Sequence, residues 1–354
     1  MLSIRRPTAF ATAALSALLL LSCGRTEPLR YRPRDGGEAP DAALACVEGV
    51  LSLKRALPEV VLVLDRSTSM DRSFAGGRTR WESLTRALAV ALPPVDQTME
   101  LGALPYPDGQ TESCAVALAP DLFPALGNAQ RILDRMRSLS PGGHTPTATA
   151  VGVAAVVAQS TRAAKAARAL VLATDGAPNC NASLSPSTCS CASGNRCDQA
   201  ILCLDDERTI GAIALQATLG LPTYVIGIQE SSSDFIEVLD RMAIAGGRPL
   251  KGGSQSYYAA TSQSELEQAF VSIRDQVGSC TWLTSSVPDD DGSIEVKLDG
   301  VVVPHDLDAK DGWAWSNRDN GELTFYGSAC ERAATSASPV VESKVLCARP
   351  DAGE

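Results

Sequence analysis

Residues 60–64 constrain the fold more than any other segment, because they form an unbroken run of valine and leucine. A strand with one face in water alternates apolar and polar residues, whereas a strand buried on both faces of a parallel sheet is apolar throughout. Residues 169–173 form a second run of this kind. The two runs predict a parallel sheet that is covered on both faces.

Helical patterns lie between and after these runs. Trp81, Leu84, Leu88 and Leu92 recur at the spacing of one helix face, and a Pro-Pro pair ends the pattern. Further strands are predicted at residues 99–104, 114–118, 223–228 and 255–259, and further helices at residues 129–139, 148–164, 206–219, 234–245 and 262–277. Because strands alternate with helices, we expect an α/β fold, a doubly wound and mostly parallel sheet flanked by helices.

The pattern changes in the last part of the chain. Ile294, Val296 and Leu298 alternate with polar residues, as in a strand with one buried face, and the Asp-Gly pair that follows favours a tight hairpin turn. We therefore expect residues 280–349 to form a small C-terminal β module that disulfides hold together, with residues 350–354 as a tail.

Three oxygen-bearing side chains stand at alternate positions after the first apolar run, and these are Asp65, Ser67 and Ser69. In an open α/β sheet, ligands bind just beyond the carboxyl ends of the strands. One carboxylate and two hydroxyls at alternate positions can converge on one hard cation, since Mg²⁺ prefers oxygen ligands. The alternative explanation is a helix N-cap, where Ser and Asp are favoured without any metal.

Two further segments are predicted to leave the same edge of the sheet. Residues 142–147 (GGHTPT) precede a predicted helix, and Thr174-Asp175-Gly176 ends the second apolar run. His144 lies in the first of these segments, but a loop histidine beside a hard-cation site is more often a bystander than a ligand. Since the chain has only two histidines, the sequence also argues against a histidine-built zinc site.

The ordered patterns D-x-S-x-S, G-x-T-P-T and T-D-G resemble the metal-ion-dependent adhesion site of von Willebrand factor A domains, and the resemblance covers about residues 59–279. It implies one bound divalent cation, which we expect to be Mg²⁺, with Mn²⁺ or Ca²⁺ as alternatives. It also implies that hydroxyls bind the cation directly and that the carboxylates act partly through coordinated water. The implied metal residues are all present, namely Asp65, Ser67, Ser69, Thr145 and Asp175.

The N-terminus has the parts of a secretory signal, which are two arginines, a short apolar run and a small residue before Cys23. The run is too short to span a bilayer comfortably, since a spanning helix takes ~20 apolar residues. Its ending, LLSC, resembles the bacterial lipobox, which implies that Cys23 becomes the first mature residue and carries a lipid. Plain secretion is the alternative. We expect a lipoprotein signal peptide at residues 1–22, a flexible tether at residues 23–45 and the von Willebrand factor A-like domain at residues 46–279.

The expected location follows from the same segment. The residue after Cys23 is glycine, and by resemblance to lipoprotein sorting rules this favours the outer membrane over the inner one. We therefore expect a cell-envelope protein, an outer-membrane lipoprotein that is either periplasmic or surface-exposed and contacts the membrane through its lipid anchor. Nucleic acid is not an expected partner, because the net charge is −10 and no basic cluster lies beyond the signal.

The chain has eleven cysteines. Apart from Cys23 they are Cys46, Cys114, Cys180, Cys189, Cys191, Cys197, Cys203, Cys280, Cys330 and Cys347. These ten cysteines are an even number, which in an exported chain predicts disulfides. The Cys-x-Cys pair of Cys189 and Cys191 lacks the usual spacing of zinc ligands. We expect most pairs to be local, within the Cys-rich insert at residues 180–203 and among the last three cysteines. The insert follows Asp175, so we expect it to overhang the metal face as a recognition surface.

These observations favour a binding or adhesion protein over an enzyme. A cation held mainly by neutral hydroxyls stays electrophilic, so we expect it to take an Asp or Glu side chain of a protein partner. One alternative is a structural envelope protein whose metal only stabilises the fold. A metal-dependent hydrolase is less favoured, because the sequence shows no base or nucleophile beyond the metal residues themselves.

Overall fold

The computed structural model describes residues 49–55, 57–109, 113–160, 167–192, 197–228, 235–250, 254–278, 280–284, 286–288, 294–319, 321–336 and 338–345. All described residues belong to one compact unit, which lies within residues 46–354. The predicted signal peptide and tether, together with Cys23, Cys46 and Cys347, lie outside the described residues. Across the described part of the chain, none of the helices is both long and apolar enough to cross a membrane.

A six-stranded sheet forms the centre of the larger part, with strand order β5-β4-β3-β6-β7-β8. All neighbouring strands are parallel except β5, which runs antiparallel to β4 at the edge. The strands are β3 (Glu59–Asp65), β4 (Glu100–Tyr106), β5 (Leu122–Ala125), β6 (Arg168–Thr174), β7 (Thr223–Ile228) and β8 (Tyr258–Ala260). The predicted α/β fold with a mostly parallel sheet is confirmed.

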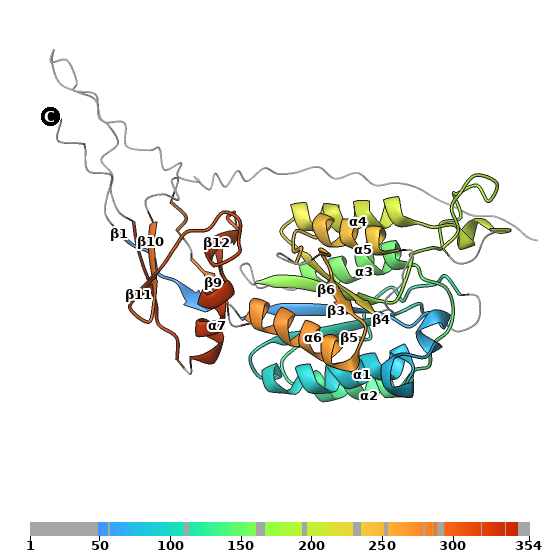
Figure 1. The fold of residues 1–354 in the computed structure, drawn as a ribbon, viewed down its shortest axis with the longest axis horizontal. Coiled ribbons are helices and arrows are strands. Elements are labelled where there is room, and N and C mark those ends of the chain that lie inside the picture. Colours follow the sequence, from blue (N-terminus) through green and yellow to red (C-terminus); the bar gives the residue numbers. More distant parts are fainter. Residues whose placement is uncertain are drawn as a thin grey trace, which may run out of the picture. The chain divides into compact units, whose positions relative to one another are not determined.

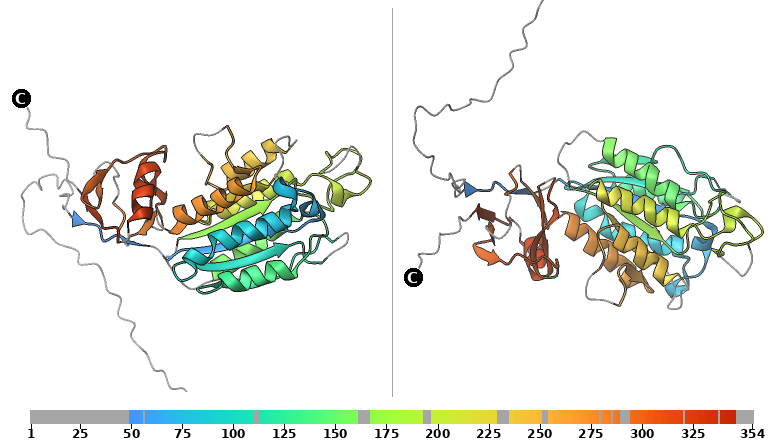
Figure 2. Two further views of the ribbon diagram at one scale, coloured as in Figure 1. Left: turned by 60° about the horizontal axis from the view of Figure 1, so that its bottom comes forward. Right: turned by 90° about the horizontal axis from the view of Figure 1, so that it is seen from above.

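Helices cover both faces of this sheet (Figures 1 and 2). One face packs against α1 (Arg80–Ala91), α2 (Ala129–Ser138) and α6 (Gln263–Gly278), and the other against α3 (Thr147–Ser160), α4 (Asp206–Thr218) and α5 (Ile236–Ala245). Alternate residues of β3 point into the two layers, Leu62 into the first and Val63 into the second. Both layers are apolar, which explains why the run at residues 60–64 is unbroken.

Helix α1 has a sharply defined start. The N-cap is Thr79, whose hydroxyl accepts a hydrogen bond from the Glu82 backbone N–H at 3.1 Å. The Glu82 carboxylate in turn accepts from the Thr79 backbone N–H at 2.9 Å. This reciprocal capping box fixes the first turn, so Arg80 lies at a defined position as the first residue of the helix.

The strand predicted at residues 114–118 is wrong. The backbone of this segment and of Ser113 before it bonds to loops rather than to a strand. The Ala115 carbonyl accepts from Asp108 N, and the Ser113 carbonyl accepts from His144 N. The edge strand is β5 instead, where the Pro124 ring packs so closely on Gly102 of β4 that a Cβ at Gly102 would lie 2.9 Å from it. Proline is tolerated at a sheet edge, and so the proline did not exclude a strand there.

The C-terminal module contains two four-stranded antiparallel sheets, with orders β1-β14-β10-β11 and β12-β13-β9-β2. Its strands are β1 (Gly49–Val50), β2 (Lys54–Arg55), β9 (Thr281–Leu283), β10 (Ile294–Leu298), β11 (Val301–Val303), β12 (Gly312–Asn317), β13 (Glu322–Tyr326) and β14 (Val341–Val345). A helix not foreseen from the sequence, α7 (Gly327–Thr335), adds Ala329 and Ala333 to the module's core. The predicted hairpin turn at Asp299-Gly300 is confirmed, with positive φ at both residues.

The first residues of the described chain belong to this module rather than to the larger part. Strand β1 pairs with β14, and β2 pairs with β9. Leu51 between them is buried in the same core as Trp313 and Phe325. The domain boundary expected at residue 46 is corrected accordingly, because pairing with late strands assigns residues 49–55 to the C-terminal module.

Candidate metal centre

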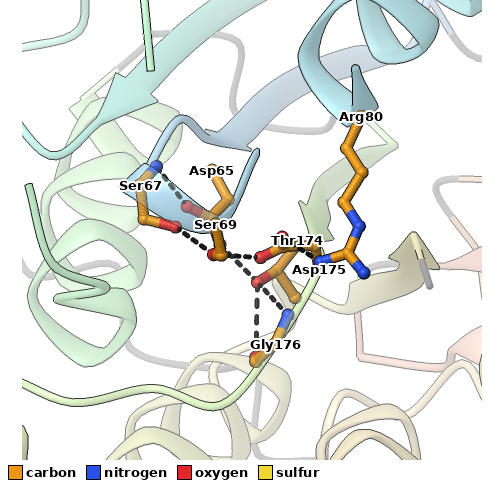
Figure 3. Close-up of polar contacts among 7 residues, drawn as sticks. All are labelled: Asp65, Ser67, Ser69, Arg80, Thr174, Asp175 and Gly176. Atoms are coloured by element: carbon orange, nitrogen blue, oxygen red, sulfur yellow. Dashed lines mark hydrogen bonds and ion pairs between the residues drawn. The ribbon is translucent and has the colours of Figure 1, made fainter. Parts of the chain in front are cut away.

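The loop after β3 turns back on its own carboxylate. Asp65 is the last residue of β3 and is fully buried. Its Oδ1 accepts a hydrogen bond from the Ser67 backbone N–H at 2.8 Å, which bends the chain so that the Ser67 and Ser69 hydroxyls lie 3.0 Å apart (Figure 3). A short 3-10 helix, η1 (Thr68–Asp71), follows at once. The three predicted residues of this loop therefore face one point.

The neighbouring strand β6 brings the second carboxylate to the same point. Thr174, its last residue, donates its hydroxyl hydrogen to Asp65 Oδ2 at 2.6 Å. Asp175 follows, and its Oδ1 accepts from the Ser69 hydroxyl at 2.7 Å. Asp65, Ser67, Ser69 and Asp175 thus belong to one connected set of hydrogen bonds, although the two aspartates come from different strands (Figure 3).

Thr145 lies in the loop before α3, next to this set. Its backbone N–H donates to Asn179 Oδ1 at 2.7 Å, and its carbonyl accepts from the Asn179 backbone N–H at 2.9 Å. The loop is tied to η1 because the Thr68 N–H and hydroxyl both donate to the Gly143 carbonyl at 3.0 Å. Among the hydrogen bonds of the described residues, none joins the Thr145 hydroxyl to the other four predicted ligands.

The donor set fits a hard divalent cation. Mg²⁺ binds oxygen at ~2.0–2.1 Å in octahedral geometry, so two adjacent ligands lie about 3 Å apart, which is the separation of the Ser67 and Ser69 hydroxyls. Ser69 gives its hydrogen to Asp175, so Ser67 is the donor in the contact between the two hydroxyls, and one lone pair of Ser69 remains available to a cation. Both oxygens of Asp175 already accept protein hydrogen bonds, as suits a carboxylate that acts through water. Ser67, Ser69 and Thr145 would hold the cation, with Asp65 and Asp175 behind them.

The electrostatics of the site also favour a cation. Burial, together with the nearby charge of Asp175, raises the pKa of Asp65 to about 7, against hydrogen bonds from Thr174 and Ser67 that lower it. Two carboxylates in a buried site repel each other, and a divalent cation between them would remove that repulsion. The arrangement is therefore one that a bound metal ion would stabilise.

No protein-family model and no curated protein sequence matches this chain. Solved structures are similar in fold. The PilB minor pilin from Streptococcus sanguinis is 16% identical over 64% of this chain and 62% of that one, with a TM-score of 0.44. The pilus adhesin SpaC from Lactobacillus rhamnosus GG is 13% identical over 81% of this chain and 39% of that one, with a TM-score of 0.45. The vWF domain of a type V pili tip protein from Porphyromonas gingivalis is 13% identical over 62% of this chain and 94% of that one, with a TM-score of 0.41.

This chain spans less than two thirds of the length of both PilB and SpaC. The likenesses concern the arrangement of the sheet and helices.

Two residues of the site carry no signal in the sequence motifs. Arg80 donates from Nη1 to Asp175 Oδ2 at 2.6 Å, and the two side chains are 12% and 1% exposed. Asn179 holds the backbone of Thr145 from both sides. Arg80 is the first residue of a helix, and Asn179 lies in an irregular loop, so neither falls at a spacing that periodicity can read.

Arg66, the variable residue of the first motif, holds two loops at the same edge. Its guanidinium donates from Nη1 to the Ser140 carbonyl at 2.5 Å and from Nη2 to the Gly109 carbonyl at 2.6 Å. Its own carbonyl accepts from Gly142 N at 2.7 Å. These bonds connect the loops after β3, β4 and α2, so the position of the metal residues depends on all three.

Three disulfides join cysteines that are close in sequence or lie in the same module. Two pairs lie inside the insert, Cys189–Cys203 and Cys191–Cys197, and Cys280–Cys330 lies in the C-terminal module, all three within the expected local groups. The first two pairs lie close together, since the sulfurs of Cys189, Cys197 and Cys203, which belong to them, lie within 4.8 Å of one another. The insert also contains the 3-10 helix η4 (Ala200–Leu202).

The fourth disulfide was not expected. Cys114–Cys180 joins the loop after β4 to the first residue of the insert. Cys180 directly follows Asn179, which holds Thr145, and Ser113 beside Cys114 accepts from His144 N. Local pairing failed here because the two loops leave neighbouring parts of the same sheet edge, a proximity that only the tertiary fold creates.

Proposed function

We propose that this protein is a lipid-anchored binding or adhesion protein of the cell envelope that holds one divalent cation, with Mg²⁺ as the first candidate. The cation would take the Asp or Glu carboxylate of a protein partner. The observation that carries this proposal is the connected set of Asp65, Ser67, Ser69 and Asp175, in which two hydroxyls stand at the spacing of adjacent ligands.

The chemistry of the donors supports recognition of a carboxylate. Hydroxyls are neutral, so ligands such as Ser67 and Ser69 leave most of the cation's charge uncompensated. A partner carboxylate brings a charged oxygen, which is a hard ligand of the kind that Mg²⁺ prefers. The coordination bond then links the two proteins directly.

The same contacts argue against a hydrolase. A metal-dependent hydrolase needs a base or a nucleophile beside the metal. Both oxygens of Asp65 accept protein hydrogen bonds, from Ser67 N and Thr174, and both oxygens of Asp175 accept as well, from Ser69 and Arg80. Each carboxylate is held in place by two donors, which suits a structural ligand better than a proton acceptor that must move.

The proposed anchor rests on the lipobox-like ending before Cys23. Acyl chains contribute ~0.8 kcal/mol for each buried methylene, so a multiply acylated cysteine is a stable anchor. Phase partitioning of the wild-type protein and of Cys23→Ser tests this proposal. Equal partition of both processed proteins into detergent would overturn it.

The decisive experiment for the site is metal titration calorimetry on wild type, Asp65→Asn and Asp65→Ala. Asp65→Asn keeps the size of the side chain and one acceptor oxygen but removes the charge, so it guards against loss of the fold. We expect Mg²⁺ and Mn²⁺ to bind the wild type and to bind both variants at least about 100-fold more weakly, with circular dichroism unchanged. Equal metal affinity in folded wild type and Asp65→Asn would contradict the site.

Partner recognition is tested separately with a peptide. A peptide with a single Asp should bind the Mg²⁺-loaded protein, and the same peptide with Asn should not. If EDTA lowers the melting temperature but leaves peptide binding unchanged, the metal only stabilises the fold and the recognition proposal is wrong.

A further inference from the structure

We infer that Arg80 sets the charge of the candidate metal centre, weakening its hold on the cation while strengthening its hold on an anionic partner. This inference rests on the proposed function. Arg80 would therefore be a specificity-determining residue, one that makes the loaded centre selective for carboxylates rather than for neutral ligands.

The position of Arg80 is built into the fold. It is the first residue of α1, whose start the Thr79–Glu82 capping box fixes. Its backbone N–H donates to the Arg72 carbonyl at 3.0 Å, which holds it to the end of η1. The side chain is 12% exposed and reaches Asp175 Oδ2 at 2.6 Å (Figure 3). Because both side chains are largely buried, solvent screens this ion pair less than it would screen an ion pair on the surface.

The contact divides the two oxygens of Asp175 between different donors. Ser69, a predicted direct ligand, uses Oδ1, and Arg80 uses Oδ2. Arg80 therefore neutralises part of the carboxylate's charge without displacing the Ser69 hydroxyl from the cation side. This keeps Asp175 behind the ligands rather than on the cation.

The charge balance gives the direction of each effect. In the cation-loaded centre, where both carboxylates are ionised, they and one guanidinium contribute a single net negative charge, so the divalent cation makes the centre singly positive and a partner carboxylate then makes it neutral. Without Arg80, the loaded centre would be neutral and its complex with a carboxylate negative. Coulomb interactions over a few ångströms are strong where water is partly excluded.

A purely structural role for Arg80 predicts something different. If Arg80 only fastened α1 to the loop after β6, its removal would loosen the site and weaken both the cation and the anion. The charge role predicts changes of opposite sign for the two ligands. The sign therefore separates the two roles.

The experiment compares wild type, Arg80→Gln, Arg80→Lys and Arg86→Gln in the full mature chain. Arg86 is the matched control, because it lies on the same helix but is 57% exposed and pairs with Glu267 at 3.7 Å. Cation affinity is measured by Mg²⁺ and Mn²⁺ calorimetry. Anion affinity is measured with acetate on the Mn²⁺-loaded protein, from the relaxation that Mn²⁺ causes in the acetate methyl protons.

We expect Arg80→Gln to bind Mg²⁺ about tenfold more tightly and acetate about tenfold more weakly, each near 1.4 kcal/mol. Arg80→Lys, which keeps the charge, should stay close to wild type in both, and Arg86→Gln should match wild type. Equal or weaker Mg²⁺ binding by folded Arg80→Gln would overturn the inference, as would unchanged acetate binding. Absence of metal binding from the wild type would instead refute the proposed function itself.

Discussion

At the scale of single residues, hydrogen bonds between protein groups already organise the candidate metal centre. Both oxygens of Asp65 and both of Asp175 already accept hydrogen bonds, and the Ser67 and Ser69 hydroxyls are already at ligand spacing. Binding a cation therefore requires little rearrangement of this part of the site. Thr145 differs from the others, because its hydrogen bonds within the described part of the chain join its backbone to Asn179 and Thr147.

We predict that Asn179→Ala weakens Mg²⁺ binding about tenfold, because residues that orient a metal ligand are typically worth 10–100-fold in affinity. Loss of the Oδ1 acceptor also leaves the buried Thr145 N–H without its partner, which costs about 1–3 kcal/mol of unfolding free energy. Calorimetry and urea unfolding measure the two effects. Asn181→Ala is the control, since Asn181 bonds to Asp205 and Ser183 rather than to Thr145. Equal metal affinity in Asn179→Ala and Asn181→Ala would contradict the role of Asn179.

The sequence could predict the residues of the site that follow a strand directly. Asp65 and Asp175 each come right after an apolar run, so the edge at which they meet follows from the parallel sheet. Arg80 and Asn179 could not be predicted in this way. Their contacts depend on where α1 begins and on how the insert folds back, and both are set by tertiary structure.

At the scale of elements, the loops at the carboxyl edge of the sheet support one another. Arg66 bonds to the loops after β4 and α2, and Thr68 bonds to Gly143 before α3. The Cys114–Cys180 disulfide joins the loop after β4 to the insert. A change in any of these loops should therefore shift the positions of the predicted metal residues, even where the changed residue makes no hydrogen bond to them.

We predict that Cys114→Ala with Cys180→Ala is more destabilising than Cys191→Ala with Cys197→Ala. The first disulfide closes a sequence separation of 66 residues and the second one of 6. Loop-closure entropy then gives losses of about 4 and about 2 kcal/mol in unfolding free energy. Only the first pair should also weaken Mg²⁺ binding, because Cys180 follows Asn179. Urea unfolding and calorimetry test this, and unchanged Mg²⁺ affinity in the first double variant would count against the coupling.

The fold was predictable in segments with a strong hydrophobic period, and it was not predictable where strands are only a few residues long. Residues 60–64 predicted β3, and the helical spacing around Trp81 predicted α1. Strands β1 and β2 have two residues each, too few for any period to show, and their partners lie near the other end of the chain. The error at residues 114–118 has a similar cause, because a short apolar segment can fill a loop as well as a strand.

At the scale of the whole described chain, three apolar cores can be separated. Two lie on either side of the central sheet, and the third belongs to the C-terminal module. Trp313 is fully buried in the third core and stacks on His305 with ring centroids 4.3 Å apart. The predicted metal residues lie at the carboxyl edge of the central sheet. Among the described residues, the two cores beside that sheet and the core of the module have no residue in common.

We predict that Trp313→Ala lowers the unfolding free energy of the module by about 3–5 kcal/mol, as truncation of a buried tryptophan does. Metal affinity should stay at the wild-type value, because the module and the metal centre draw on separate cores. Differential scanning calorimetry should show one shifted transition, and Mg²⁺ titration should be unchanged. A parallel fall in metal affinity would show that the module is needed to shape the metal centre.

The pairing of β1 with β14 and of β2 with β9 has a mechanical consequence. If the proposed partner and the proposed lipid anchor were pulled apart, the tension would pass β1 and β2 before it reached β3. Each pairing offers only two residues to resist the pull, so we expect these strands to detach first, as an early extension step in single-molecule pulling. The freed residues would lengthen the link between the proposed anchor and β3, so a sudden load would extend this link before it reached the candidate metal centre.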